Sequence, residues 1–167
     1  VYQKDELFLM EAEDFVSIPE QKEVTFPMTP LFSPFDFDMS FGVIAGVTLA
    51  STTLDKGYFV FSLNAPVAFL TDVDVEVTIK NGLLNGSPMS KVVTLPVGST
   101  SATDSLKLDQ GIIDLSSGGV NFIGIKADIL NAINVLPQSG TLDLSIQLRN
   151  ISIDKTEGDF GQRTLSL

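Results

Sequence analysis

The feature that most constrains this chain is a strict alternation of apolar and polar residues. In "DVDVEVTIK" (72–80), branched apolar residues occupy every second position, and charged or hydroxyl-bearing residues occupy the positions between them. Successive side chains of a β-strand point to opposite faces of a sheet, so this pattern predicts a strand with one buried and one solvated face. The segment "TLDLSIQL" (141–148) repeats the pattern. Strands of this kind require a second layer that covers their apolar face.

Turn signals separate several other segments of the same kind. The further strand candidates are 41–50, 57–64, 91–97, 105–115 and 120–125. Turn-forming residues stand at 55–57, 81–82, 85–88 and 98–99, and glycine or asparagine in them suits the positive φ angles of tight turns. Eight or nine short strands with this punctuation predict an all-β fold, an antiparallel β-sandwich, with a closed β-barrel as the alternative.

Two places interrupt the period of two. After Leu148 the next apolar pair is Ile151 and Ile153, which have the opposite parity, so one extra residue near Asn150 is expected to form a β-bulge or bend. In 125–137, apolar residues recur at intervals of three and four and a proline ends the run. That spacing predicts one short amphipathic helix, which would lie over one end of the sandwich.

The length of 167 residues fits one domain with a sizeable core. Residues 1–23 are rich in acidic residues and predict an N-terminal lead-in that is extended or briefly helical and partly mobile, ahead of a single sandwich domain at 24–167. No apolar run approaches the roughly 18 residues of a membrane span, and no signal-peptide pattern is present. Because the chain begins at Val1, we expect an export signal to have been removed upstream and the location to be extracytoplasmic: secreted, periplasmic or on the cell surface.

The composition excludes several kinds of chemistry. The chain has no Cys, His or Trp, so thiol nucleophiles, zinc–thiolate sites, histidine bases and a Ser-His-Asp triad are all impossible. The serine-rich stretch 98–105 is therefore expected to be a polar loop. With 21 acids against 10 bases, the formal charge is −11. This charge opposes binding to nucleic acid and to anionic membranes, so we expect no nucleic-acid partner. Because the catalytic chemistries named above are excluded, we also expect a non-enzymatic protein.

Three acidic residues of the predicted strand at 72–80 have the spacing of a catalytic carboxylate group. Asp72, Asp74 and Glu76 lie two residues apart, and such neighbours on one strand face are separated by about 6.6–6.8 Å, within the range of a glycosidase carboxylate pair. Acids that alternate with buried valines are, however, the normal appearance of a solvated sheet face. The interpretation favoured by the pattern is a surface.

A second acidic group, in "DKTEGDFG", contains Asp154, Glu157 and Asp159 around a glycine. Carboxylates clustered in a turn supply the hard oxygen ligands that Ca²⁺ takes, and Asp36 and Asp38 could add a second acidic loop. The EF-hand spacing is absent, and the favoured interpretation is a hairpin turn with solvated acids. Calcium is retained as the alternative, with Asp154, Glu157 and Asp159 as its ligands, and no other cofactor is expected.

The stretch "TFPMTPLFSPFDFDMSFG" (25–42) combines five phenylalanines with three prolines. From Phe35 onward its aromatic and apolar residues keep one parity, which predicts an extended segment that covers the core. The prolines upstream are expected to prevent regular strand pairing and to let aromatic side chains fold over a sheet edge. The alternative is an exposed patch for a protein partner, formed by Phe32 and Phe35.

These observations leave three hypotheses about function. The first is a non-catalytic structural or protein-interaction module of a cell envelope or surface assembly. The second is a module that binds glycan or lipid, although an aromatic platform for sugars would have to do without Trp and with only Tyr2 and Tyr58. The third is a carboxylate-based glycoside hydrolase or lyase, which needs two acids in one cleft.

Overall fold

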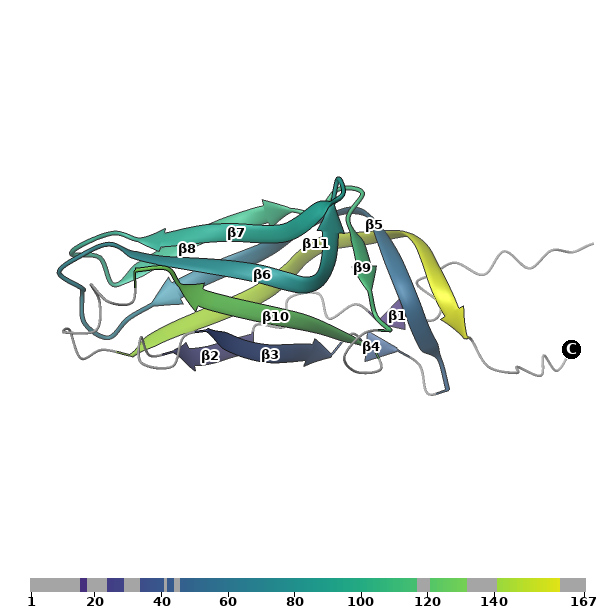
Figure 1. Ribbon diagram of the computed structural model, residues 1–167, viewed down its shortest axis with the longest axis horizontal. Coiled ribbons are helices and arrows are strands. Elements are labelled where there is room, and N and C mark those ends of the chain that lie inside the picture. The colour runs from purple at the N-terminus through teal and green to yellow at the C-terminus, as the bar shows by residue number, and fades with distance from the viewer. Residues whose placement is uncertain are drawn as a thin grey trace, which may run out of the picture.

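The computed structural model describes residues 16–17, 24–28, 34–40, 42–43, 46–116, 121–131 and 141–159. Every regular element within these ranges is a strand. In chain order the strands are β1 (Val16–Ser17), β2 (Val24–Met28), β3 (Phe35–Ser40), β4 (Gly42–Val43), β5 (Thr48–Asn64), β6 (Val73–Leu84), β7 (Ser87–Leu95), β8 (Ser101–Lys107), β9 (Ile112–Asp114), β10 (Phe122–Ile129) and β11 (Leu142–Asp159) (Figure 1). The prediction of an all-β fold is confirmed.

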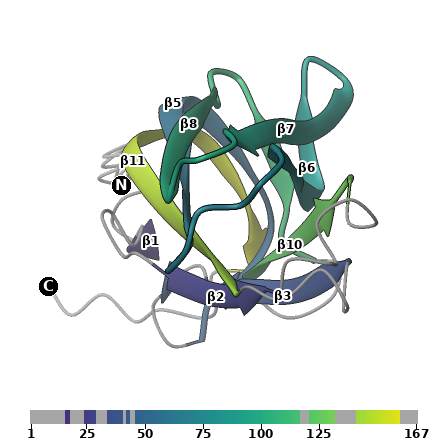
Figure 2. The same ribbon diagram turned by 90° about the vertical axis from the view of Figure 1, so that its left-hand side faces the viewer.

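Nine of these strands form one antiparallel sheet that folds over itself. Its hydrogen-bonded path runs β2-β11-β5-β9-β6-β10-β3, while β8 pairs with β5 and β7 pairs with β6. The short β9 connects the two halves, so that β8-β5-β11-β2 forms one layer and β7-β6-β10-β3 forms the other, as in a β-sandwich. Figure 2 looks along the strands and shows these layers on opposite sides of the core. The described residues of the end strands β2 and β3 do not pair with each other, so the sheet is not closed into a barrel.

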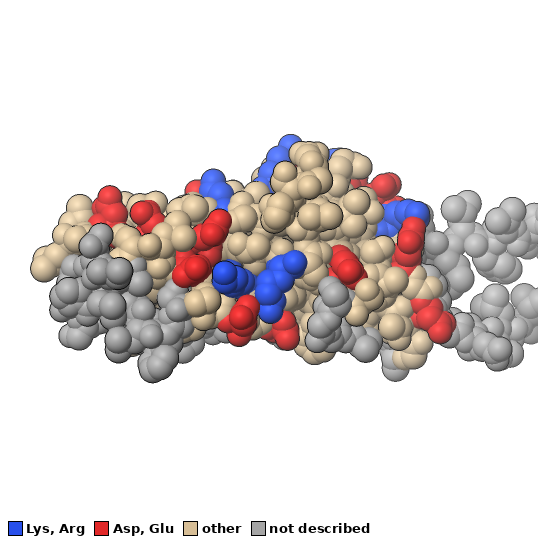
Figure 3. Space-filling model, in the orientation of Figure 1, with Lys and Arg blue, Asp and Glu red and all other residues tan. Residues whose placement is uncertain are grey.

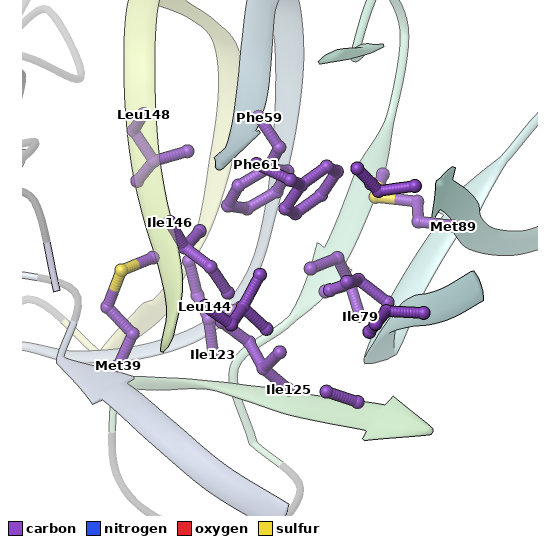
Figure 4. Close-up of a cluster of buried hydrophobic side chains, with 14 of the residues drawn as sticks. Met39, Phe59, Phe61, Ile79, Met89, Ile123, Ile125, Leu144, Ile146 and Leu148 are labelled. Atoms are coloured by element: carbon purple, nitrogen blue, oxygen red, sulfur yellow. The ribbon is translucent and has the colours of Figure 1, made fainter. Parts of the chain in front are cut away.

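The core lies between the two layers and is built by the alternating residues. Figure 4 shows side chains from β5, β6, β10 and β11 that point toward one another. Phe59 and Phe61 of β5 are fully buried, and their rings stack at a centroid distance of 6.1 Å. The apolar residues of β6 that were predicted to face inward are buried as well: Val73, Val75, Val77 and Ile79. Burial of these faces is the main force that holds the layers together.

The predicted bulge in β11 is confirmed. The register between β5 and β11 shifts between Arg149 and Ser152, and Asn150 has a φ of 52°. On the opposite strand Gly57 has a φ of 149°. The shift restores the inward direction of Ile151, which is buried, after the parity change in the sequence. Residues 55–57 and 81–82 were predicted to be turns, and the structure instead places them inside β5 and β6.

The predicted helix at 125–137 is wrong over its described part. Ile125 and Ile129 belong to β10, which pairs with β3 on one side and β6 on the other. Residues four apart share a face in a strand as well as in a helix, so their spacing did not distinguish the two. Ile123 and Ala127 continue the alternation and are fully buried. Residues 132–137 lie outside the described ranges.

Two further expectations about irregular segments need correction. Residues 101–105 of the expected polar loop form most of β8, an edge strand whose inward positions pack against the rim of the core. Pro27, which was expected to prevent pairing, lies in β2 opposite Asp143. Proline is tolerated there because β2 is an end strand with a paired neighbour on one side, so the missing N–H interrupts no second ladder. Of residues 1–23, Val16 and Ser17 are described, and they pair with β4.

At the left of Figure 1 lie the last residues of β2, β5, β7 and β10 and the first residues of β3, β6, β8 and β11. In each of the four connections between these strands, the two strands that are joined belong to opposite layers. We call the described residues of three of them, 65–72, 96–100 and 130–131, the loop end. Among the residues that the structure describes, no helix is long and apolar enough to cross a membrane.

The layers also meet along the edge strands β7 and β8, where an ion pair bridges them. Lys91 shares the inward parity of Met89 and Val93, and Asp104 shares that of Ala102 and Leu106. The Lys91 Nζ lies 3.0 Å from an Asp104 carboxylate oxygen. The Lys91 ammonium, as a hydrogen-bond donor, holds the pKa of Asp104 below its ordinary value. Inward-pointing charges on edge strands also discourage pairing with strands of other molecules.

We expect the Lys91→Met variant to lose about 0.5–1 kcal/mol of unfolding free energy near pH 7, because the pair is partly solvent-screened. A carboxyl group whose pKa is lowered by folding stabilises the fold above its unfolded pKa, and this contribution disappears as the pH falls through the lower, folded value. The stabilities of wild type and variant should therefore converge as the pH falls through the lowered pKa of Asp104. Urea unfolding at several pH values measures this.

The Lys107→Met variant is the matched control for this pair. Lys107 pairs with Asp109 at 2.6 Å, but that pair is local and does not bridge the layers. Its replacement should change stability less than Lys91→Met does. A stability difference for Lys91→Met that persisted at low pH would show that lost packing of the lysine stem, rather than the ion pair, is responsible.

Candidate functional site

Carboxylates of β6, together with that of Asp72 just before it, accept hydrogen bonds from β7 and from Val97 just after β7. The Thr94 hydroxyl donates to Asp74 at 2.6 Å, and the Ser90 hydroxyl donates to Glu76 at 2.8 Å. The backbone N–H of Val97 donates to Asp72 at 2.7 Å. All three acids alternate with buried valines on the outer face of the layer, as the surface interpretation predicts. Their geometry is that of a polar seam between β6 and β7.

The acids of 154–159 lie on a strand, not in the hairpin turn that was predicted. They belong to β11, which continues to pair with β5 as far as Asp159. The Lys155 ammonium contacts the Glu157 carboxylate, which lowers the pKa of Glu157 and raises the pKa of Lys155. No group of three or more acidic residues that could hold a metal ion occurs on the described part of the chain. The assignment of calcium to Asp154, Glu157 and Asp159 stays a prediction without such a group to support it.

The aromatic segment at 35–39 covers the core from β3. Phe35 and Phe37 are half-buried and pack against the core cluster, while Met39 is buried. Asp36 and Asp38 alternate with them and are exposed, and the Lys80 ammonium lies 3.2 Å from Asp36. This arrangement agrees with the core-covering interpretation for 35–39. Phe32 lies outside the described residues, so the partner-binding role of Phe32 and Phe35 stays a prediction.

The loop end carries the most exposed large apolar side chains among the described residues. Leu70 is 78% exposed, Val67 72%, Val97 56% and Leu130 54%, whereas the next, Leu83, is 48% exposed and lies near β9. All four belong to connections that emerge at one end of the two layers. Exposed apolar side chains that gather at one end of a fold are typical of an interaction surface.

Hydrogen bonds hold the connections of the loop end to one another. The N–H of Gly98 donates to the carbonyl of Phe69 at 3.1 Å, and the N–H of Ala65 donates to the carbonyl of Thr100 at 2.8 Å. Phe69 is buried and anchors its connection in the core. The two connections 65–72 and 96–100 therefore present their exposed side chains from a common framework.

The third connection is bound to the start of β6. The side-chain amide of Asn131 donates to the carbonyl of Asp72 at 2.5 Å and accepts the N–H of Asp74 at 3.2 Å. The N–H of Leu130 donates to the carbonyl of Asp74 at 2.9 Å. These three bonds place Leu130 beside the first residues of β6, next to the connection that carries Leu70.

The sequence contained a weak signal for this surface. In "NAPVAFLTD" (64–72), Val67 and Leu70 follow a proline, and Leu70 has the opposite parity to the apolar residues of both flanking strands. Apolar residues in a connection are either anchors, as Phe69 is, or exposed, as Val67 and Leu70 are. Which of the two applies depends on where the connection lies on the folded sheet.

No protein-family model matches this chain, and no curated protein matches it. The geometry of the loop end is therefore the basis for assigning a function.

Proposed function

We propose that this chain is a non-catalytic protein-interaction module of an extracytoplasmic assembly, and that the loop end contacts the partner protein. The observation that carries the proposal is the grouping of Val67, Leu70, Val97 and Leu130 at one end of the fold. Binding residues are commonly placed on loops that a rigid scaffold positions. Burial of these side chains in an interface removes apolar area from water, which favours association.

The hydrogen bonds within the loop end also support an interaction role. Association requires the contacting loops to lose conformational freedom, and this loss weakens binding when the loops are mobile before binding. Here the backbone bonds between Gly98 and Phe69 and between Leu130 and Asp74 order the loops in the free protein. The backbone that carries these side chains is thus already ordered before a partner arrives.

Site-specific photocrosslinking tests this proposal. A photoreactive phenylalanine analogue is introduced at Leu70, or at Leu83 as a control, and the protein is irradiated in cells of its natural source. We expect a discrete adduct with one protein from position 70 and none of the same kind from position 83. The adduct should weaken when Val97→Ser and Leu130→Ser are added.

The contrary outcomes are equally specific. If position 70 yields no protein adduct while the folded protein is present in normal amount, the loop end is not the interaction surface. Equal adducts from both positions would mean that contact is unspecific. Circular dichroism of each variant establishes that the fold is retained.

A further inference from the structure

The charged residues at the loop end and in the strand residues next to it are of one sign. Residues 64–74, 94–103, 128–131 and 141–143 include four acids, Asp72, Asp74, Asp128 and Asp143, and contain no Lys or Arg. In Figure 3 the left end of the molecule shows red atoms among tan ones, and blue atoms appear only farther along the body.

Elsewhere on the described chain, lysines pair with several of the acids, namely Asp36, Asp55, Asp104, Asp109 and Glu157. Each of the six lysines in the described ranges lies no farther than 3.9 Å from a carboxylate oxygen. One of these pairs, between Lys126 and Asp128, reaches toward the loop end. No lysine or arginine of the described chain forms an ion pair with Asp72, Asp74 or Asp143. The carboxylates of Asp72, Asp74 and Asp143 are therefore not neutralised by a cation of the described chain.

We call the carboxylates of Asp72 and Asp143 the acidic rim of the loop end. Asp72 illustrates how this rim can accept a hydrogen bond from a partner's cation. Its Oδ1 accepts the N–H of Val97 at 2.7 Å, which holds the carboxylate beside one exposed apolar side chain and two residues from Leu70. An ionised carboxylate offers about four acceptor positions over its two oxygens. Asp72 is exposed, so its remaining positions face water and can accept a hydrogen bond from a lysine or arginine.

We infer that the partner presents an apolar contact surrounded by Lys or Arg, so that its apolar side chains meet Val67, Leu70, Val97 and Leu130 and its cations meet Asp72 and Asp143. This inference rests on the proposed function and specifies the chemistry of the partner. A second copy of this chain would place the same acidic rim against itself in a symmetric contact, where like charges repel. Nucleic acid and anionic membrane surfaces would be repelled for the same reason.

Binding of short labelled peptides to the full chain tests the inference. The probes are a Lys/Leu peptide, a Glu/Leu peptide and a Lys/Ser peptide of equal length, measured by fluorescence anisotropy in low salt. The Lys/Leu peptide should bind most tightly, and Val67→Ser/Leu70→Ser should weaken it about tenfold because two apolar contacts are lost. The matched control Leu83→Ser/Ile112→Ser removes exposed apolar side chains away from the loop end and should leave the affinity unchanged.

The acidic rim is tested separately with Asp72→Asn/Asp143→Asn. Asparagine keeps an acceptor for the Val97 N–H, so the fold is preserved while two negative charges are removed. We expect about threefold weaker binding of the Lys/Leu peptide and a smaller loss of affinity on addition of salt. Unchanged affinity and unchanged salt dependence would contradict the role of the rim.

Four other results would overturn the inference. They are equal binding of the Glu/Leu peptide, equal binding of the Lys/Ser peptide, binding to phosphatidylcholine vesicles that Val67→Ser/Leu70→Ser abolishes, and a dimer in sedimentation that the same variant dissociates. Failure here is distinguishable from failure of the proposed function. A photocrosslinked partner whose contacting surface lacks basic residues overturns the inference alone, whereas the absence of any adduct at Leu70 overturns the proposed function.

Discussion

The Gly57→Ala variant should lose about 3 kcal/mol of unfolding free energy, because the substitution combines backbone strain with a steric clash. Gly57 has a φ of 149°, a conformation that L-residues with a side chain rarely adopt. A Cβ at this position would overlap the Cδ1 atom of Ile151 on the neighbouring strand. Urea unfolding followed by far-ultraviolet circular dichroism measures the loss.

Gly86→Ala separates the two contributions at Gly57. Gly86 also has a positive φ, of 78°, but a Cβ there would have no atom within 4 Å. Its replacement should destabilise by about 1 kcal/mol through backbone strain alone. The clash at Gly57 is tested by adding Ile151→Ala, and the double variant should lose less stability than the sum of its single variants. Equal losses for Gly57→Ala and Gly86→Ala would contradict the steric argument.

Gly57 also shows why turn-forming residues alone do not predict a turn reliably. Its neighbours Asp55 and Lys56 make a good local turn signal, and the sequence by itself predicted a turn. The glycine is needed inside a strand, because β11 carries the bulge at Asn150 and brings Ile151 against the backbone of β5. Both halves of this feature were visible in the sequence, one as a parity change and the other as a glycine. Their partnership depends on strand pairing across about 90 residues, which local patterns do not specify.

The alternating segments were predictable because burial on one face leaves a direct trace in the sequence. Val73, Val75, Val77 and Ile79 are buried as expected, since a shift by one residue would move all of them into water. The error at 125–129 arose where this trace was ambiguous. Ile125 and Ile129 fit both periods. The segment is a strand because β3 and β6 flank it and supply its hydrogen bonds.

The candidate interaction surface was less predictable than the fold. Hydropathy treats Val67, Leu70 and Phe69 alike, yet Phe69 is buried and the other two are the most exposed large apolar residues described. What separates them is the path of the connection as it crosses between the layers, together with its bond to Gly98. The excess of acidic residues was visible in the composition. The position of the acidic rim beside these side chains, however, follows only from the strand order. A site assembled from three connections is a property of topology.

The Asn121→Ala variant should lose about 2–4 kcal/mol of unfolding free energy, because two buried backbone groups would be left without partners. The Asn121 side chain is buried, accepts the N–H of Leu49 at 2.8 Å and donates to the carbonyl of Val47 at 3.1 Å. These bonds join residues 72 and 74 positions apart and fasten the start of β5 to the start of β10. Thermal and urea unfolding measure the effect.

Asn150→Ala is the matched control for Asn121→Ala. Asn150 also has a positive φ, 52° against 64° for Asn121, but its side chain is exposed. Both variants place alanine in a left-handed conformation, so the difference between their stabilities isolates the two buried hydrogen bonds. Equal losses would show that these bonds contribute nothing beyond the backbone conformation.

Asn121→Asp gives an independent test through pH. The introduced carboxylate can still accept the N–H of Leu49 but, when ionised, faces the carbonyl of Val47 with no proton to donate. Burial and this carbonyl favour the protonated form, so the pKa of the introduced group is raised by folding. A carboxyl group whose folded pKa is raised destabilises the protein above that pKa, and the loss is recovered as the pH falls below it. We therefore expect the loss of unfolding free energy in Asn121→Asp, relative to wild type, to shrink on acidification. The loss in Asn121→Ala should stay constant over the same pH range. A loss that is independent of pH for both variants would rule out the donor role of Asn121.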